Sequence, residues 1–187
     1  MDIEVRPIMQ SELRAAADVA ARSLFHLFTH VGEDPVEQLV AAYAAYRTIP
    51  WEGQRTVAAF AEGDIVAMAK TTEPGNCWCD RIDEAPEPTD ENEAGVLAYR
   101  RFLDEYHPDV PHWWFGPVGV EPGMQRRGLG TLVMQAALED IVQGGAGEVW
   151  LESEPHIAGF YRRLGFTDMA EAADPDGITL IFQRLIV

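Results

Sequence analysis

The chain alternates short strand-like runs with longer segments of helical periodicity, and this order limits its possible folds more than any other feature. Residues 3–8 ("IEVRPI") and 148–153 ("EVWLES") are short runs typical of strands. Two more strand-like runs, within residues 55–71, are joined by Glu-Gly-Asp, which predicts a hairpin. The full order, β-α-α-β-β-α-β-α-β-α-β, predicts an α/β fold in which helices flank one mixed sheet.

The size and charge of the chain are those of an ordinary globular protein. It has 187 residues, of which 47% are hydrophobic and 24% charged, and we expect a single domain over residues 1–187. The formal net charge of −17 argues against a nucleic-acid-binding surface, because phosphate binding needs a basic face. The same charge is compatible with a cationic substrate, although acidic charge alone often serves solubility.

Several sequence features bear on the cellular compartment. Cys77 and Cys79 are the only cysteines, and with one residue between them they are poorly placed for a structural disulfide. The chain does not start with a basic leader and an apolar run, and no segment has the about 20 apolar residues of a membrane helix. We therefore expect a cytoplasmic protein that binds neither membranes nor nucleic acids. Residues 74–90, rich in proline and acidic side chains, are expected to form a surface insertion.

Capping residues mark three expected helix starts. Ser11 precedes apolar residues at helical spacing and is the expected N-cap of the first helix. Asp34 is followed by a proline and, three residues after it, by a glutamate. Asp90 has a glutamate at the same spacing and opens a helix that is expected to run to about Tyr106.

The stretch "VGVEPGMQRRGLGTLVM" (residues 118–134) places two arginines beside glycines where a strand leads into a helix. A helix start has unpaired backbone N–H groups and a positive dipole, and glycines let a phosphate approach the backbone. The stretch therefore predicts a diphosphate site, with a plain packing turn as the alternative. The Walker pattern fails because Leu129 stands where lysine is required, and the dinucleotide pattern has Val133 in place of its third glycine.

Two ordered motifs occupy the C-terminal half of the chain. Gln125, Gly128 and Gly130 have the spacing Gln-x-x-Gly-x-Gly and follow the segment "GPVGVEP". About one helix and one strand later, residues 160–166 read "FYRRLGF". In this order the motifs resemble the acyl-CoA signature and the tyrosine-bearing helix of the general N-acetyltransferase (GNAT) superfamily. The resemblance covers residues 112–184.

The resemblance implies a fold and a cofactor site. GNAT enzymes transfer an acyl group, usually acetyl, from coenzyme A to an amine, and they hold the pantetheine between two splayed central strands. These strands would be residues 112–120 and 148–152. Gly116 and Pro117 are expected to interrupt the first of them with a bulge or a splayed edge, because proline cannot donate to a sheet. Backbone groups of the first strand would hold the thioester and pantetheine, and loop amides the diphosphate. The expected acetyl-CoA-binding residues are Val118, Gly119, Val120, Gln125, Arg126, Arg127, Gly128, Leu129, Gly130 and Thr131.

The resemblance also implies catalytic residues. Tyr161 matches the family's general acid, and a phenol that is protonated at neutral pH can donate to a departing thiolate. Packing beside Phe160 is the alternative role for Tyr161. Glu152 is the favoured general base because it ends a splayed strand. The other candidate bases are Glu121, Glu154, His112 and His156, with a water chain as a further alternative. Glu154 stands where the family often has asparagine, so a cofactor contact there is not carried over.

We therefore expect a transferase that moves an acetyl group from acetyl-CoA to a primary amine of a small molecule or peptide, by direct attack in a ternary complex. The alternatives are a GNAT-shaped module that binds coenzyme A without turnover and a dinucleotide-dependent enzyme. No metal is expected, because His26 and His30 lack the glutamate of a His-Glu-x-x-His site. Cys77 and Cys79 have no evident base that would make them nucleophiles. The acceptor, the acyl chain length and the oligomeric state stay open, although homodimers are frequent in the family.

Overall fold

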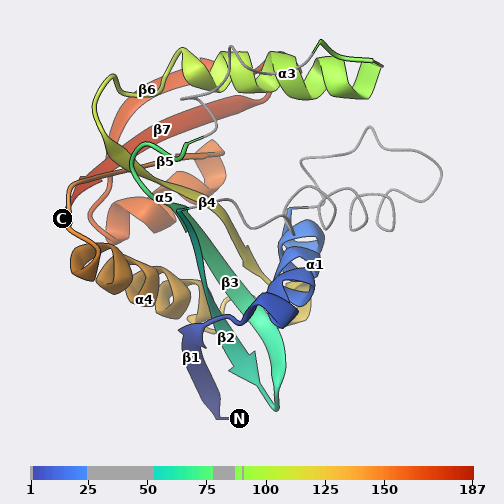
Figure 1. Ribbon diagram of the computed structural model, residues 1–187, viewed down its shortest axis with the longest axis vertical. Coiled ribbons are helices and arrows are strands. Elements are labelled where there is room, and N and C mark those ends of the chain that lie inside the picture. Colours follow the sequence, from blue (N-terminus) through green and yellow to red (C-terminus); the bar gives the residue numbers. More distant parts are fainter. Residues whose placement is uncertain (1, 25–52, 78–86, 90) are drawn as a thin grey trace. The chain divides into compact units, whose positions relative to one another are not determined.

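A computed structural model describes four ranges of the chain: residues 2–24, 53–77, 87–89 and 91–187. Strands and helices alternate along these ranges (Figure 1). The helix expected after Asp34, the pair His26 and His30, and Cys79 lie outside the described residues, as does most of the insertion expected at 74–90. Among the helices that the structure describes, none has the length and apolar character needed to span a membrane.

Seven strands and four α-helices are present in the described residues. The strands are β1 (Ile3–Pro7), β2 (Gln54–Ala61), β3 (Asp64–Thr72), β4 (His112–Val120), β5 (Glu148–Ser153), β6 (Thr167–Ala173) and β7 (Thr179–Ile186). The α-helices are α1 (Leu13–Ser23), α3 (Glu91–Asp104), α4 (Leu129–Gln143) and α5 (Pro155–Arg163). The short 3-10 helices η1 (Gln10–Glu12) and η4 (Pro122–Met124) precede α1 and α4.

The strands are hydrogen-bonded in the order β1-β2-β3-β4-β5-β7-β6. β4 is parallel to β5, whereas β1 is antiparallel to β2 and β7 is antiparallel to both β5 and β6. The sheet is therefore mixed, which confirms the predicted α/β class. β2 and β3 form the predicted hairpin, and its turn residues Glu62 and Gly63 have φ values of 53° and 94°. Positive φ at both positions is the requirement of a type I′ turn.

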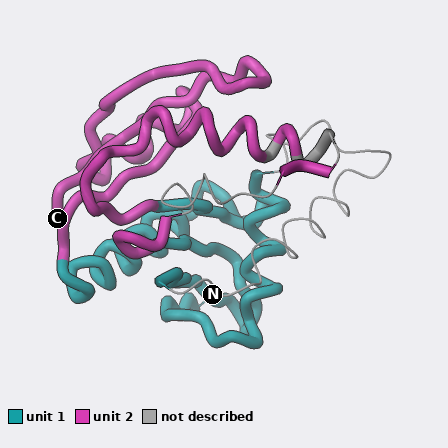
Figure 2. Tube along the Cα trace, turned by 45° about the horizontal axis from the view of Figure 1, so that its top comes forward, with its two compact units in different colours: residues 1–71, 115–145 teal, residues 72–114, 146–187 magenta. Residues whose placement is uncertain are grey.

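The chain divides into two compact units, which have different colours in Figure 2. The residues of unit 1 are 1–71 and 115–145, and those of unit 2 are 72–114 and 146–187. β4 contributes to both units, and its residues 112–114 pair with residues 148–150 of β5 in unit 2. This parallel pairing ends before Gly116 and Pro117, where the sequence predicts the splay. A single domain over the whole chain stays a prediction.

Unit 1 is built around β1, β2 and β3, with α1 and α4 on opposite sides of these strands (Figure 1). α1 buries a stripe of alanines, which packs against Ala58 and Phe60 of β2 and Met68 of β3. The small alanine side chains of α1 let the larger side chains of the sheet pack closely against the helix at interior density. α4 packs against β1 and β2, and Arg55 of β2 forms an ion pair with Asp140 of α4 at 3.1 Å.

The core of unit 2 is aromatic and lies between α3 and strands β4, β5 and β7. Its buried residues are Cys77, Leu103, Trp114, Trp150, Leu180 and Phe182. Tyr99 and Phe102 of α3, and Tyr106 just after it, pack against these residues. The Tyr106 ring stacks on Phe182 with ring centroids 4.5 Å apart. Large rings bury much apolar area, so these contacts position α3.

The predicted cap of the first helix is wrong. α1 follows η1 directly, and the turn is closed by Glu12 rather than by Ser11. The Glu12 carboxylate accepts hydrogen bonds from Arg6 at 2.7 and 2.9 Å and from the Met9 N–H at 2.7 Å. The guanidinium, together with the amide, lowers the pKa of Glu12 to about 2. A carboxylate that receives several charge-assisted bonds displaces the weaker serine cap.

Two strands also differ from the sequence-based expectation. β6 was not predicted, because its sequence "TDMAEAA" is polar and most of its residues are exposed. It is the edge strand of the sheet beside β7. β4 was expected to be interrupted at Gly116 and Pro117, but it continues through them, with a cis peptide bond between the two residues.

Candidate functional site

The loop between β4 and α4 is attached at its start to β3 and α1, all within unit 1. The Glu121 N–H donates to the Val66 carbonyl at 2.9 Å, and the Met124 N–H donates to the Glu121 carbonyl at 2.8 Å. The Arg22 guanidinium of α1 donates to both carboxylate oxygens of Glu121 at 3.0–3.2 Å. Glu121, one of the candidate bases, is therefore the partner of an arginine and fixes the loop to α1.

The second half of this loop contains two residues in the left-handed backbone conformation. Arg126 has a φ of 61°, and Gly128, the N-cap of α4, has a φ of 82°. A residue other than glycine is uncommon in this region, so Arg126 marks a constrained turn. A Cβ atom built on Gly128 meets nothing within 4 Å. Glycine is therefore favoured at this position by its backbone conformation, and the space around it is open.

The first turn of α4 has the character of an anion site. The first N–H groups of an α-helix have no partner within the helix, and a glycine N-cap has no side chain that could accept from them. Leu129 is buried, with 3% of its surface exposed, and anchors the turn. The exposed residues before it are Gln125, Arg126, Arg127 and Gly128. Unpaired helix-start amides, the helix dipole and two exposed arginines thus adjoin one another along the chain where a diphosphate could bind.

The residues expected to hold the pantetheine are the last three of β4. Val118 and Val120 are half-buried, and Gly119 is buried. A Cβ atom on Gly119 would lie 2.6 Å from Ser23 Oγ and 3.0 Å from Ala20 Cα. No side chain fits there, so glycine is needed for α1 to pack on β4. Gly119 therefore has a packing role that sequence reasoning did not identify.

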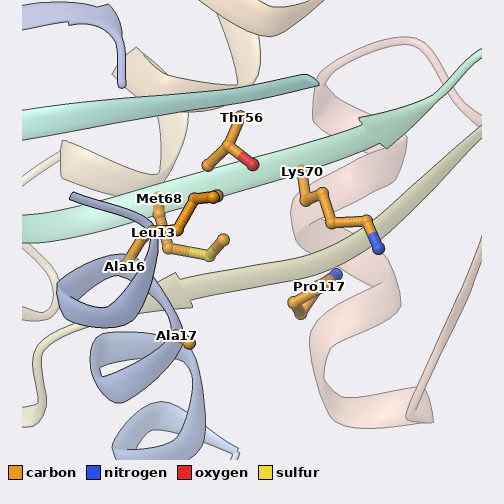
Figure 3. A pocket seen from close by; sticks show the side chains of 7 residues that line it. All are labelled: Leu13, Ala16, Ala17, Thr56, Met68, Lys70 and Pro117. Atoms are coloured by element: carbon orange, nitrogen blue, oxygen red, sulfur yellow. The ribbon is translucent and has the colours of Figure 1, made fainter. Parts of the chain in front are cut away.

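A small cavity also lies in unit 1, among α1, β2, β3 and β4 (Figure 3). Its lining residues are Leu13, Ala16, Ala17, Thr56, Met68, Lys70 and Pro117. In Figure 3 the Lys70 side chain extends toward Pro117. The cavity volume of about 20 Å³ is room for about one water molecule. It is therefore too small to hold a pantetheine arm.

Tyr161 lies on α5 of unit 2, and the end of this helix explains the Gly-Phe of its motif. The Phe166 N–H donates to the Tyr161 carbonyl at 3.2 Å, and the Gly165 N–H donates to the Arg162 carbonyl at 3.1 Å. With Gly165 at a φ of 98°, these bonds form a Schellman cap. The cap sets the Phe166 ring edge-on to the Tyr161 ring, with centroids 6.0 Å apart, and the Phe160 ring lies at 5.0 Å.

The phenol of Tyr161 is in a setting that keeps it protonated. The residue is only 8% exposed, and burial raises the pKa of the phenol above its ordinary value. The negative charge of Glu152, on β5 of the same unit, raises this pKa further. Glu152 is half-buried, and its Oε2 atom is shielded from solvent. Tyr161 and Glu152 are therefore coupled electrostatically, and the tyrosine carries a proton at neutral pH.

A buried amide holds α5 in place. Gln183 on β7 is fully buried, and its Oε1 accepts from Ser153 Oγ at 3.0 Å. Its Nε2 donates to the Ala158 carbonyl at 3.3 Å and to Asp168 Oδ1 at 2.8 Å. Asp168 also pairs with Arg162 at 2.5 Å. Because buried polar groups need partners, this network joins β5, α5, β6 and β7 in one arrangement.

Replacing Gly165 with alanine is expected to lower the free energy of unfolding by about 1–2 kcal/mol, because an L-residue with positive φ is strained. The new Cβ would also lie 3.2 Å from Leu185 Cδ1. Gly159→Ala is the matched control, since a Cβ there meets only Arg163 Nη1 at 3.9 Å and alanine suits a helix interior. In urea denaturation, the midpoint of Gly165→Ala should be lower than that of wild type, and the midpoint of Gly159→Ala should not be lower. Equal midpoints for the two variants would refute the strained cap.

The remaining candidate bases have different surroundings. Glu154 is the N-cap residue of α5, and its carboxylate lies 4.0 Å from His156 Nδ1. His112 is buried, and its ring nitrogens contact the Val110 carbonyl and the His107 ring. Among the candidates, Glu152 is the one whose charge acts on the tyrosine.

The residues expected from the sequence thus gather in two places. The cofactor candidates all lie in unit 1, at the end of β4, in the following loop and at the start of α4. Tyr161 and Glu152 lie together in unit 2. Sequence reasoning missed Arg22 and Gln183, which hold the loop and α5. Arg22 is 99 residues away from Glu121, so no local motif could have indicated the pair.

Comparison with known proteins identifies relatives of the sequence. Residues 19–166 match the acetyltransferase (GNAT) family. A segment of 68 residues is 46% identical to "GCN5-related N-acetyltransferase 1, chloroplastic" of Arabidopsis thaliana and covers 36% of this chain and 32% of that protein. A segment of 101 residues is 35% identical to "Probable acetyltransferase TAP2" of Glycine max and covers 54% of this chain and 38% of that protein. The chain therefore matches well under two thirds of the length of these relatives.

Solved structures share the fold over almost the whole chain. The polyamine N-acetyltransferase of Drosophila melanogaster, an enzyme that forms N-acetylagmatine, is similar with a TM-score of 0.72 and 18% identity, and the match covers 100% of both chains. The PaiA N-acetyltransferase of Thermoplasma acidophilum in complex with coenzyme A has a TM-score of 0.62 and 13% identity, with coverage of 99% and 100%. At these identities the similarity shows a shared fold.

Proposed function

Because the chain belongs to the GNAT acetyltransferase family, we propose that it transfers an acetyl group from acetyl-CoA to a primary amine. The observation that carries the proposal is the exposed left-handed turn of Arg126 and Gly128, which opens α4 with free backbone amides. Coenzyme A has a diphosphate that such amides recognise. The nucleotide alternatives need a lysine at Leu129 or a glycine at Val133, and neither is present.

Residues of unit 1 would bind the cofactor. The amides from Gln125 to Gly130 would hold the diphosphate, and the exposed side chains of Arg126 and Arg127 would add positive charge in a chain whose formal net charge is −17. The backbone of Val118 and Val120 would hold the pantetheine. The Val118 amide would also stabilise the oxyanion that forms when the thioester carbonyl is attacked.

The proposed reaction is a direct attack without a covalent enzyme intermediate. The protonated amine first gives a proton to the base, for which we propose Glu152. The free amine then attacks the thioester carbonyl, so that a C–N bond forms and the C–S bond breaks. Tyr161 donates its proton to the departing thiolate and regains one as the new amide loses its second N–H proton. The balance is one acetylated amine, one CoA thiol and one released proton.

The electrostatic coupling between Glu152 and Tyr161 favours this order of proton transfers. A thiol has an ordinary pKa of about 8.5, below that of a buried phenol, so proton transfer from Tyr161 to the thiolate is uphill. The negative charge of Glu152 is one of the causes that raise the Tyr161 pKa. When Glu152 accepts the amine proton, its charge is neutralised and the Tyr161 pKa falls. The acid is therefore strengthened in the step in which it must donate.

We propose that the acceptor is a cationic amine. The net charge of −17 favours a cationic amine over an anionic one, because the field of the chain attracts positive charge. Small amines and peptide amines are both compatible with this field. We also propose a cytoplasmic location without binding to membranes or nucleic acids, although the Arabidopsis relative is named chloroplastic. Homodimer formation stays a prediction.

An assay of CoA release over a panel of amines tests the function. The panel contains polyamines, agmatine, serotonin and lysine-containing peptides, with an anionic amine such as glutamate as a matched control. Turnover with at least one cationic amine is the expected result, together with calorimetric binding of CoA and no binding of NAD. Tight CoA binding without transfer to any amine would favour the alternative, a GNAT-shaped module without turnover. NAD binding without CoA binding would contradict both the proposed transferase and the CoA-binding module.

A further inference from the structure

Three potential metal ligands from separate segments of unit 2 meet in its interior. Cys77 follows β3, His107 follows α3, and His112 is the first residue of β4. The sulfur of Cys77 and one ring nitrogen of each histidine all lie within 4.8 Å of one another. Cys77 and His112 are buried, with 2% and 6% of their surfaces exposed. The proposed acetyl transfer uses none of these three residues, although His112 is one of the alternative candidate bases.

The position of the Nδ1 hydrogen of His112 is set by its surroundings. Its Nδ1 lies 2.8 Å from the Val110 carbonyl oxygen, which can only accept, so Nδ1 carries the hydrogen. The neutral ring then has a lone pair on Nε2, the nitrogen that points into the cluster. A ring N–H bonded to a backbone carbonyl is also the arrangement that orients histidine ligands in metal sites. His112 is thus preorganised as a ligand through Nε2.

The distances between the ligand atoms are close to those of a tetrahedral zinc site. Zinc bonds of about 2.0 Å to nitrogen and about 2.3 Å to sulfur place two nitrogens about 3.3 Å apart, and sulfur and nitrogen about 3.6 Å apart. In the structure, His112 Nε2 lies 3.1 Å from His107 Nδ1, and Cys77 Sγ lies 3.9 and 4.0 Å from the two His107 nitrogens. The third pair, Cys77 Sγ and the His112 nitrogen, lies within 4.8 Å, so a shift of up to about 1 Å would complete the geometry.

The ring of His107 is supported by an aromatic neighbour. His107 stacks on Trp114 with centroids 3.9 Å apart and an interplanar angle of 19°. Sliding or rotating on this flat surface keeps the stacking contact, so the small movement of His107 costs little.

We propose that Cys77, His107 and His112 bind one Zn²⁺ ion in the interior of unit 2, with a water molecule or another group as the fourth ligand. Thiolate and imidazole are the ligands that zinc prefers, whereas calcium and magnesium take oxygen. Binding would release the Cys77 thiol proton, and the hydrogen between the two histidine rings would move to the other nitrogen of His107, so that both imidazoles bind as neutral ligands. The ion would tie together the segments after β3, after α3 and at the start of β4. This proposal replaces the expectation, drawn from the sequence, that the protein holds no metal, and it does not depend on acetyl transfer.

Cobalt substitution tests the site on the whole chain. The purified protein is stripped with a chelator, dialysed and titrated with Co²⁺, and then with Zn²⁺. We expect saturation at one ion per chain, a thiolate-to-Co²⁺ charge-transfer band in the near ultraviolet, visible bands of a tetrahedral site, and loss of both when Zn²⁺ is added. Thermal melting should also show a higher Tm for the zinc-loaded protein than for the stripped protein.

Variants assign the ligands. Cys77→Ser is expected to lose the charge-transfer band, and His107→Ala to keep a weakened band with a lower affinity for Co²⁺. His156→Ala is the matched control, because this histidine of unit 2 is exposed and lies outside the cluster, and its spectrum should equal that of wild type. A wild-type protein without the charge-transfer band at saturating Co²⁺ would overturn the proposal, and that measurement does not depend on how the variants fold. A band that persists in a folded Cys77→Ser variant would overturn it as well.

Discussion

Tyr161→Phe is expected to lower kcat by about 100- to 10,000-fold, the usual contribution of a general acid. The substitution removes the phenolic O–H and keeps the ring that packs against Phe160 and Phe166. The fold should therefore be retained, and the Kd of acetyl-CoA, measured by calorimetry, should stay close to wild type. The effect should appear in kcat, in a CoA-release assay at saturating amine and acetyl-CoA.

Tyr106→Phe is the matched control for the loss of a hydroxyl group. Tyr106 also lies in unit 2, where it stacks on Phe182 in the core, and it has no proposed role in the reaction. Its kcat should stay close to wild type. Equal rates for wild type and Tyr161→Phe would remove the proposed acid and favour the water chain or a packing role for the tyrosine.

The pH dependence of kcat should carry the signature of the same tyrosine. Burial, and then the charge of Glu152, raise the pKa of Tyr161 above its ordinary value of about 10. A raised pKa means that the protonated form persists to higher pH, so ionisation of Tyr161 should not reduce kcat below about pH 10. A fall in kcat between pH 7 and 9 that is absent in Tyr161→Phe would contradict this assignment.

Gly128→Ala is expected to weaken acetyl-CoA binding by about tenfold. An alanine with a φ near 82° is strained by about 1–2 kcal/mol, and a factor of ten corresponds to about 1.4 kcal/mol. In the free protein the exposed loop can relax out of this conformation without losing packing. Binding must then restore the turn, so the strain appears as lost affinity. Calorimetry with acetyl-CoA measures the change in Kd.

Gly123→Ala is the matched control in the same loop. A Cβ atom at Gly123 or at Gly128 meets nothing within 4 Å, but only Gly128 has a positive φ. The two variants therefore add the same methyl group to open space and differ in backbone strain. Gly123→Ala should bind acetyl-CoA with nearly wild-type affinity. Equal weakening in both variants would show that crowding, and not the left-handed turn, determines binding.

Much of the fold could be predicted from the sequence because local patterns determine it. The "EGD" turn of the β2–β3 hairpin, the helical periodicity of α4 and the strand-like run of β5 all indicate their elements. The motif "FYRRLGF" indicates more than a helix, since its glycine and second phenylalanine form the Schellman cap that packs against Tyr161. Where the signal is a turn residue or an apolar period, the prediction and the structure agree.

The missed features depend on neighbours that are distant in the sequence. β6 is polar and largely exposed, and its pairing with β7 could not be expected from "TDMAEAA". Ser11 is a good cap by type, but Arg6 and the Met9 amide converge on Glu12 instead. Gln183 is a single amide after the apolar run "ITLIF", and only the structure gives it its partners on β5, α5 and β6.

The turn geometry of the candidate cofactor loop was predictable from the sequence, whereas the partners of the other candidate residues were not; the cofactor contacts themselves stay a prediction. A glycine-rich helix start is a local feature, so the loop around Gly128 could be identified from spacing alone. The cluster of Cys77, His107 and His112 has separations of 30 and 5 residues and matches no metal-binding spacing. Its members come together only because α3 packs across the strands of unit 2.

The central claim is that backbone amides at the start of α4 bind the diphosphate of coenzyme A. A crystal structure of the protein grown with saturating acetyl-CoA tests it most directly. We predict diphosphate oxygens within hydrogen-bond distance of amides between Gln125 and Gly130, with the left-handed turn at Gly128 retained. Acetyl-CoA bound at another position, or an unliganded turn at saturating cofactor, would contradict the claim.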